Sequence, residues 1–227
     1  VKRGYSSNYC RPVFAVMDPE LTMTLPSYQT ACGCVDILMH TMERYFNHSG
    51  SMEITDGIAE ALMQTVIRNA PIVMQRPDDY NARAEIMWAG SLSHNGLTDC
   101  GCDHGDWATH KMEHELGGLF DVAHGAGLAA IWGSWARYVC DADYARFARF
   151  ATKVLNVAPQ ATDQETALAG IAAMEQFYRS IQMPTSLREL GVSPTEEQIQ
   201  EMARKCILAT KGPAGKVKPL QQNDVEN

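Results

Sequence analysis

The helical spacing of the apolar residues is the feature that most constrains this chain. From Ser27 onward, apolar side chains recur every three or four residues, which is the period that turns one face of an α-helix toward a core. Breaks rich in Pro, Gly or Asp separate the periodic stretches. The pattern predicts an all-α body with helices at 27–46, 54–74, 79–95, 106–117, 124–139, 144–155, 163–182 and 194–209.

The two ends of the chain break this pattern. Val13–Met17 is a β-branched and aromatic run followed by Asp18 and Pro19, which predicts a strand. A lone strand cannot pair its own backbone groups, so residues 1–18 are expected to be a residual strand and linker from a sheet outside this chain. Residues 19–210 are expected to form a helical metal-binding domain. Residues 211–227 have lost helical periodicity and are expected to be a loop or tail.

The charge and the cysteine content limit which partners and which cell compartment are expected. The chain has 27 acidic against 19 basic residues and a net charge of -8, without a cluster of Lys and Arg, which argues against nucleic-acid and anionic-membrane partners. It has no apolar run of the length that crosses a bilayer. Its seven cysteines are an odd number in a chain too long to need disulfides, so reduced thiols and a cytoplasmic location are expected.

Histidines and a carboxylate follow the helical spacing. Asp36 and His40 are four residues apart and therefore share one face of a predicted helix. His110 and His114 repeat that spacing, and His124 follows a break that contains two glycines. Imidazole and carboxylate ligands without thiolate suit Fe(II) and Zn(II), and such a set can leave a position open for a substrate oxygen. Asp36, His40, His110 and His124 together predict a divalent metal site.

Three segments of the chain resemble a known family. They are DPELTMTLPSYQTACGCVDILMHTMERYF, LSHNG and GDWATHKMEHELGGLFDVAHGAGLA, and they are similar to the iron-containing (group III) alcohol dehydrogenases, closest to the butanol dehydrogenase branch. The resemblance covers essentially the whole chain and includes the family's Asp-x3-His and His-x13-His spacings. It implies metal ligands at Asp36, His40, His110 and His124, and a catalytic role for His114 near the substrate and the nicotinamide.

The resemblance also implies a fold and a reaction. The fold is the dehydroquinate synthase-like C-terminal helical domain of the family, a multi-helix bundle. The reaction is oxidation of a primary alcohol such as butanol, or reduction of the aldehyde, with NAD(P) as hydride carrier and a divalent metal, Fe2+ ahead of Zn2+, as Lewis acid. The cofactor domain is expected to be missing from this chain, so cofactor-binding residues stay unassigned and the isolated chain is expected to be inactive. The sequence does not decide whether the chain forms a homodimer.

Two other functions compete with this interpretation. The string from His110 to His114 fits H-x-x-E-H, in which both histidines bind zinc and Glu113 activates water in a peptidase. That hypothesis leaves Asp36, His40 and His124 unexplained. Under the dehydrogenase interpretation Glu113 lies on the solvent side or supports a ligand. The second alternative is a fragment that binds a metal without catalysis.

Further short motifs have simpler explanations. Gly125–Ala130 matches G-x-G-x-x-A, either a dinucleotide-binding turn or glycines that allow close helix packing. The Cys100–His104 segment, CGCDH, replaces the glycine-rich approach of the resembled family and predicts a surface loop. His94 is left without a predicted role.

Overall fold

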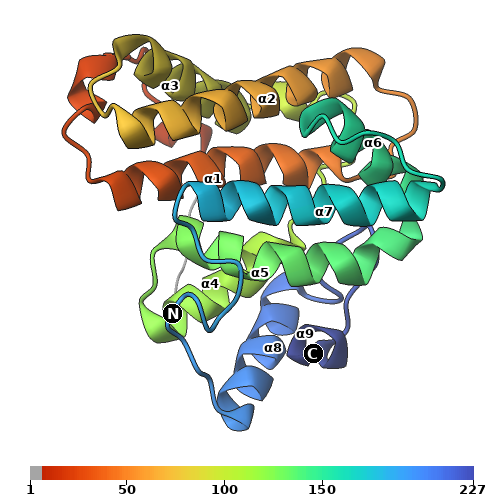
Figure 1. Cartoon of the computed structure of the whole chain (residues 1–227). Helices are drawn as coiled ribbons and strands as arrows, with labels where there is room; N and C mark the ends of the chain where they lie inside the picture. The colour runs from red at the N-terminus through yellow and green to blue at the C-terminus, as the bar shows by residue number, and fades with distance from the viewer. Residues whose placement is uncertain (1–6) are drawn as a thin grey trace.

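The computed structural model describes residues 7–227, and its body is helical (Figure 1). Its α-helices are α1 (Ser27–Tyr45), α2 (Glu53–Gln75), α3 (Tyr80–His94), α4 (Ala108–Phe120), α5 (His124–Val139), α6 (Tyr144–Val154), α7 (Asp163–Ser180), α8 (Glu196–Thr210) and α9 (Gln222–Glu226). Short 3-10 turns lie at Asn8–Cys10, Pro19–Thr22, Leu97–Asp99 and Cys140–Ala142. The all-α prediction is confirmed, and the helices from α1 to α8 agree with the predicted ranges to within a few residues.

Helix α1 lies at the centre of the packing. Figure 1 shows α2 and α3 on one side of α1, α4 and α5 on the other, and α8 and α9 at the far end of the molecule. Direct contacts join α1 to α2, α3 and α5. The sequence of α1 suits this position because adjacent residues such as Leu38 and Met39 are both buried, which requires apolar neighbours on more than one face.

Glycines allow α5 to approach α1 and α4 closely. A Cβ atom at Gly125 would lie 2.1 Å from the carbonyl oxygen of Cys32, and one at Gly127 would lie 2.9 Å from Cγ of Glu113. The G-x-G-x-x-A string lies within the first turns of α5, and residues 119–123 form no strand before it. The glycines therefore serve helix packing, and this packing sets the position of His124, the first residue of α5.

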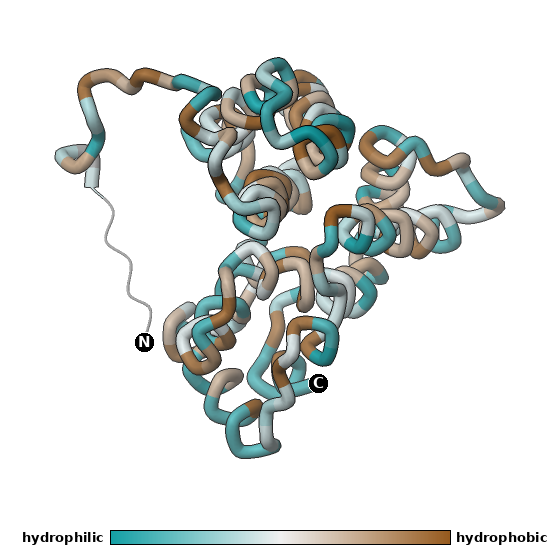
Figure 2. The backbone as a smooth tube through the Cα atoms, turned by 60° about the vertical axis from the view of Figure 1, so that its left-hand side comes forward, coloured by the Kyte–Doolittle hydropathy of each residue, from teal (hydrophilic) through white to brown (hydrophobic). Residues whose placement is uncertain are grey.

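Val13–Met17 forms no strand in the described structure, and its expected pairing with a sheet outside this chain stays a prediction. These residues have no regular secondary structure, and Val13 and Phe14 are largely exposed. Figure 2 shows this partly hydrophobic segment running apart from the helices before it reaches α1. A strand needs a paired neighbour, and residues 7–227 provide no other strand for it. Residues 1–6 of the predicted segment lie outside the described residues.

The prediction of a loop or tail at 211–227 also needs correction. Ala214 and Leu220 form an isolated antiparallel bridge, and both are buried. The buried carboxylate of Asp106 accepts hydrogen bonds from the backbone N–H groups of Lys216 (2.6 Å) and Val217 (2.8 Å), and α9 follows. Periodicity failed to reveal this packing because an irregular segment can be buried when side chains satisfy its backbone.

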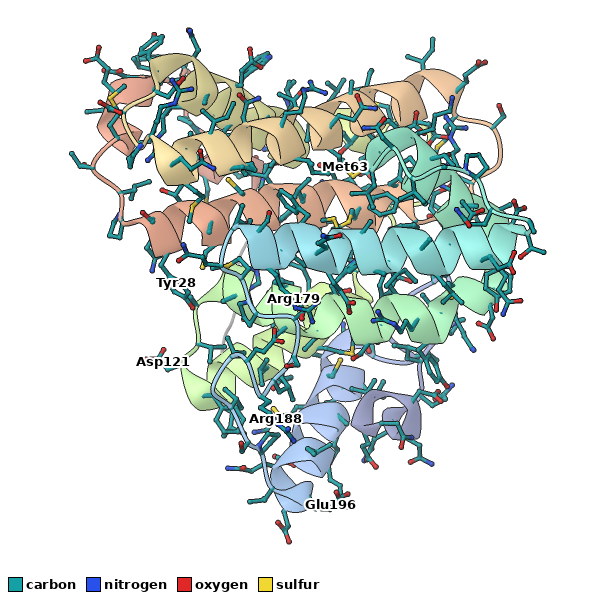
Figure 3. The ribbon with its side chains drawn as sticks, in the orientation of Figure 1. Tyr28, Met63, Asp121, Arg179, Arg188 and Glu196 are labelled. Carbon is teal, nitrogen blue, oxygen red and sulfur yellow. The ribbon has the colours of Figure 1, made fainter. Side chains whose placement is uncertain are left out.

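Core and surface positions separate clearly in this fold. Figure 3 shows Met63 between α2 and α1, where it is fully buried, and the exposed side chains of Arg188 and Glu196 at the opposite end. Among the described residues, no helix combines the length and the apolar character that a bilayer span requires.

Candidate metal centre

Asp36 and His40 project from the same face of α1, one turn apart. Oδ1 of Asp36 lies 3.7 Å from Nε2 of His40. Both side chains are partly exposed, so this face of α1 is accessible from outside the helical body. The i, i+4 spacing predicted from the sequence therefore places both groups as expected.

Helices α4 and α5 bring two more imidazoles to the same carboxylate oxygen. Nε2 of His110 and Nε2 of His124 each lie 3.5 Å from Oδ1 of Asp36. Four ligand atoms about 2.1 Å from the centre of a tetrahedron lie roughly 3.4 Å from one another. The observed spacings of 3.5 to 3.7 Å from Asp36 Oδ1 match three edges of that tetrahedron. Asp36, His40 and His110 form one group whose ligand atoms lie within 4.8 Å of one another, and His124 belongs to a second such group with Glu113 and His114. The structure thus brings the three predicted imidazoles to Asp36 Oδ1, but His124 does not complete a group of four with the others.

The atoms that face one another at this point lack ordinary partners. Among the described residues, Oδ1 of Asp36 and Nε2 of His110 are buried and form no hydrogen bond. Leaving such a buried group unsatisfied costs about 1–3 kcal/mol, and more when it is charged. A divalent cation would satisfy the carboxylate and the ring nitrogens at once. The residues present therefore fit a metal ion.

Burial and close charges shift the pKa values of these candidate ligands. Burial raises the pKa of Asp36, but close contacts with His110 and His94 outweigh it and hold that pKa well below its usual range. Burial lowers the pKa of His40 to about 3. Burial also opposes the charged form of His110, yet its contacts with Asp36 and Glu43 raise the pKa to about 9. Metal binding would displace that proton, because an imidazole ligand must be deprotonated.

Two buried glutamates hold the imidazoles from behind. Oε1 of Glu43 accepts hydrogen bonds from the backbone N–H of His110 and from its Nδ1, both at 3.1 Å. Glu113 contacts Nδ1 of His124 through Oε2 and is fully buried. A carboxylate at Nδ1 fixes the ring and leaves Nε2 free to face a metal. The prediction of a solvent-side position for Glu113 is wrong, and the alternative supporting role agrees with this contact.

His114 lies beside the four-residue cluster and is not one of its members. Its ring centroid is 6.3 Å from that of His110 and 5.6 Å from that of His124. Burial lowers the pKa of His114 to about 4, so the imidazole is neutral near pH 7. The catalytic role of His114 stays a prediction, with a position next to the candidate ligands.

Sequence reasoning assigned no role at the metal to three further residues of this site. They are Glu43, His94 and Trp107. The Trp107 ring lies 5.2 Å from the ring of His40 and 5.1 Å from that of His110, and His94 contacts Asp36 from α3. Glu43 is three residues after His40 on α1, a spacing that hinted at a shared face. His94 and Trp107 lie in two of the segments that carry the family resemblance, LSHNG and GDWATHKMEHELGGLFDVAHGAGLA, but the sequence assigned neither residue a role at the metal.

The competing motifs do not form sites of their own. In a peptidase of the H-x-x-E-H type, Glu113 would have to reach a water, but its carboxylate is buried against His124. Cys100 is exposed and Cys102 is half-buried, in agreement with a surface loop. The metallopeptidase alternative therefore has no support in the geometry.

Comparisons with known proteins agree on one family. The model of the Fe-containing alcohol dehydrogenase family, C-terminal, matches residues 30–227. NADH-dependent butanol dehydrogenase A of Clostridium acetobutylicum is 36% identical over 225 residues, which are 99% of this chain and 57% of that protein. NADPH-dependent aldehyde reductase YqhD of Escherichia coli is 35% identical over 191 residues, 84% of this chain and 49% of that protein.

A solved structure shows the same fold. The crystal structure of NADH-dependent butanol dehydrogenase A from Thermotoga maritima has a TM-score of 0.90 and 34% identity, over 97% of this chain and 56% of that one. Fold and site together define a helical domain with a candidate metal centre. The chain belongs to the Fe-containing alcohol dehydrogenase family and corresponds to its C-terminal part. It spans about half the length of these relatives, from 49% to 57%.

Proposed function

We propose that this chain supplies the metal-binding and substrate-activating part of an NAD(P)-dependent alcohol dehydrogenase. The substrate class is a primary alcohol of butanol-like size, or the corresponding aldehyde. The observation that carries the proposal is the convergence of three ring nitrogens on Oδ1 of Asp36, at 3.5 to 3.7 Å. The names of the relatives, which include butanol dehydrogenases and an aldehyde reductase, support the substrate class and the nicotinamide cofactor.

In this proposal Asp36, His40, His110 and His124 hold one divalent metal. Three imidazoles and a carboxylate suit both Fe2+ and Zn2+, and the family name favours Fe2+. A metal at this point supplies a Lewis acid that polarises the oxygen of the alcohol or the carbonyl.

The remaining residues prepare the site for proton transfer. Glu43 and Glu113 fix the rings of His110 and His124 through their Nδ1 atoms. His114 is half-buried and neutral near pH 7, so it is available to accept the proton that an alcohol loses on oxidation and to return it on reduction. The ring of Trp107 contacts the rings of His40 and His110.

Metal stoichiometry tests the ligand set. The purified chain is reconstituted with Fe(II) without oxygen, or with Zn(II), and metal and protein are measured together. We expect about one bound equivalent, lost in Asp36→Ala and His124→Ala. His48→Ala is the matched control, because His48 is exposed and contacts the carbonyl of Val217 instead of a ligand. Full stoichiometry in both ligand variants would show that the four-residue site is wrong.

A non-catalytic metal-binding chain would give the same stoichiometry, so a second measurement separates it. The full chain, loaded with metal, is assayed for NADH or NADPH formation with butanol, in comparison with His114→Ala. Turnover that depends on the metal and on His114 supports the dehydrogenase and shows that the expectation of a missing cofactor domain is wrong. Without turnover, binding of butanol that depends on the bound metal supports the substrate-activating role, and no such binding supports the non-catalytic alternative.

A further inference from the structure

His94, the last residue of α3, faces the metal centre from a helix that provides none of the four candidate ligands. Its Nε2 lies 3.6 Å from Oδ2 of Asp36. Its ring centroid lies 3.8 Å from that of His40, with an angle of 36° between the planes. One side chain therefore contacts both candidate ligands of α1.

The other ring nitrogen of His94 is anchored. Nδ1 lies 3.0 Å from the carbonyl oxygen of Gly90 and 2.7 Å from Oγ of Ser93. The hydroxyl of Ser93 is a donor to Nδ1, which places the hydrogen of the ring on Nε2, the nitrogen that faces the Asp36 carboxylate. The contacts at Nδ1 fix the plane of the ring, in the same way that partners at the second nitrogen orient imidazoles at metal sites.

The end of α3 is itself tied to α1. Arg44 donates a hydrogen bond to the carbonyl of Ser93 at 2.6 Å and another to the carbonyl of His40 at 3.0 Å. The guanidinium group of Arg44 thus joins the backbone of Ser93, the residue before His94, to the backbone of His40. This link holds the end of α3 against α1.

The two oxygens of Asp36 have separate surroundings. Oδ1 faces the ring nitrogens of His40, His110 and His124, whereas Oδ2 faces His94. The carboxylate of an aspartate rotates about χ2, and the distribution of this torsion is broad. Contact with one oxygen alone therefore leaves the carboxylate free to rotate. A contact on the second oxygen restricts that rotation and leaves the first directed at the metal position.

We propose that His94 is a positioning residue of the metal centre, which orients Asp36 through its Nε2 and His40 through ring contact. The inference rests on the proposed function, since it assumes that Asp36 and His40 bind a divalent metal. It assigns a role to a histidine that lies outside the Asp-x3-His and His-x13-His spacings. The effect is preorganisation: both α1 ligands are held in the binding geometry before the ion arrives.

The test measures Co(II) affinity of the full chain by competition with a chelator. Residues that orient metal ligands are worth 10–100-fold in affinity, so we expect His94→Ala to raise the dissociation constant by about that factor. His94→Phe keeps a ring against His40, and His94→Gln keeps an amide nitrogen near Asp36. Each is expected to recover part of the loss. The matched control is His104→Ala, whose side chain is 87% exposed and contacts Asp99, and it should bind like the unaltered chain.

Three results would overturn the proposal. The first is a dissociation constant within about threefold of the unaltered chain in all three His94 variants. The second is a weaker affinity in His94→Ala with an unchanged visible spectrum of bound Co(II), since misplaced ligands must change the ligand field. The third is loss of one nitrogen coupling from bound Cu(II) in electron paramagnetic resonance, which would make His94 a ligand instead.

Failure of the proposed function gives a different pattern. If Asp36→Ala and His110→Ala retain one tightly bound Co(II), the metal lies elsewhere and the four-ligand site is wrong. If those variants lose the ion while the His94 variants keep it at normal affinity and with a normal spectrum, only the role of His94 is wrong. Thermal unfolding of each variant without metal shows whether it is folded before the affinities are compared.

Discussion

The candidate metal centre and the ion-pair cluster between α2 and α6 both contain carboxylates, but their carboxylates differ in hydrogen bonding. Within the described residues Asp36 Oδ1 at the candidate metal centre makes no hydrogen bond, whereas Asp56 and Glu60 of the ion-pair cluster both accept hydrogen bonds. The ion-pair cluster consists of Tyr45, Asp56, Glu60, Arg146 and Arg149. Arg146 donates to both oxygens of Asp56, at 2.5 and 2.7 Å. Glu60 accepts from Arg149 at 2.7 Å and from the hydroxyl of Tyr45 at 2.8 Å.

At the metal centre the partners of the carboxylate are of a different kind. Oδ1 of Asp36 faces ring nitrogens at 3.5 to 3.7 Å, beyond hydrogen-bond distance, and makes no hydrogen bond within the described chain. A guanidinium beside a carboxylate completes a structural pair. Imidazoles converging on a carboxylate leave room for a cation that the chain itself does not supply. The kind of partner, and not burial, therefore separates the functional cluster from the structural one.

The largest effect is expected from Arg146→Met in the ion-pair cluster. The change leaves the buried Asp56 without its bidentate partner, and breaking a buried pair in this way costs about 3–5 kcal/mol of the free energy of unfolding. Urea denaturation measures the loss. The double variant Arg146→Met with Asp56→Leu should recover most of it, since both charges are then removed. Bound metal per chain should stay unchanged, and a reduced stoichiometry would contradict the separation of the two clusters.

A bound metal should stabilise the chain through the other cluster. Zn(II) at about 100 times its dissociation constant is expected to raise the free energy of unfolding by about 2.7 kcal/mol, because it binds the folded state. A chelator should reverse the change, and Asp36→Ala should not show it. In Arg146→Met, Zn(II) should raise the free energy of unfolding by the same amount, although this variant is less stable without the metal. Equal stabilisation of Asp36→Ala would place the metal outside this centre.

Glu43→Gln should weaken the metal centre without dismantling it. Glu43 is buried and orients His110 through Nδ1, and loss of such a partner typically lowers metal affinity 10–100-fold. Chelator competition with Zn(II) measures the change. Glu201→Gln on α8 is the control, because that glutamate is exposed and pairs only with Arg204 and Lys205. An unchanged affinity in Glu43→Gln would mean that His110 needs no support from α1.

The sequence predicted the helices and the four candidate ligands because both depend on local spacing. Asp36 and His40 share a helix face by their i, i+4 relation alone, and the apolar period predicts each helix without knowledge of its neighbours. The family resemblance then joined α1 to α4 and α5, which spacing alone does not do.

The supporting residues needed the tertiary structure. His94 contacts Asp36 from the end of another helix, and Glu113 turns inward because glycines let α5 approach α4. The segment 211–227 lacks any period, and its burial follows from Asp106, whose carboxylate binds the backbone at Lys216. Contacts between distant segments leave no repeating pattern in the residues themselves.

The smallest effect is expected from Arg149→Gln, and it tests whether the ion-pair cluster acts as one unit. Arg149 contacts Glu60 at 2.7 Å and Asp56 at 3.4 Å, but its side chain is 37% exposed, against 13% for Arg146. Solvent screens such a pair, so the loss in free energy of unfolding should stay below about 1 kcal/mol. Urea denaturation of Arg149→Gln beside Arg146→Met gives the comparison. A loss as large as that of Arg146→Met would show that both arginines stabilise Asp56 together, and that exposure does not rank the members of this cluster.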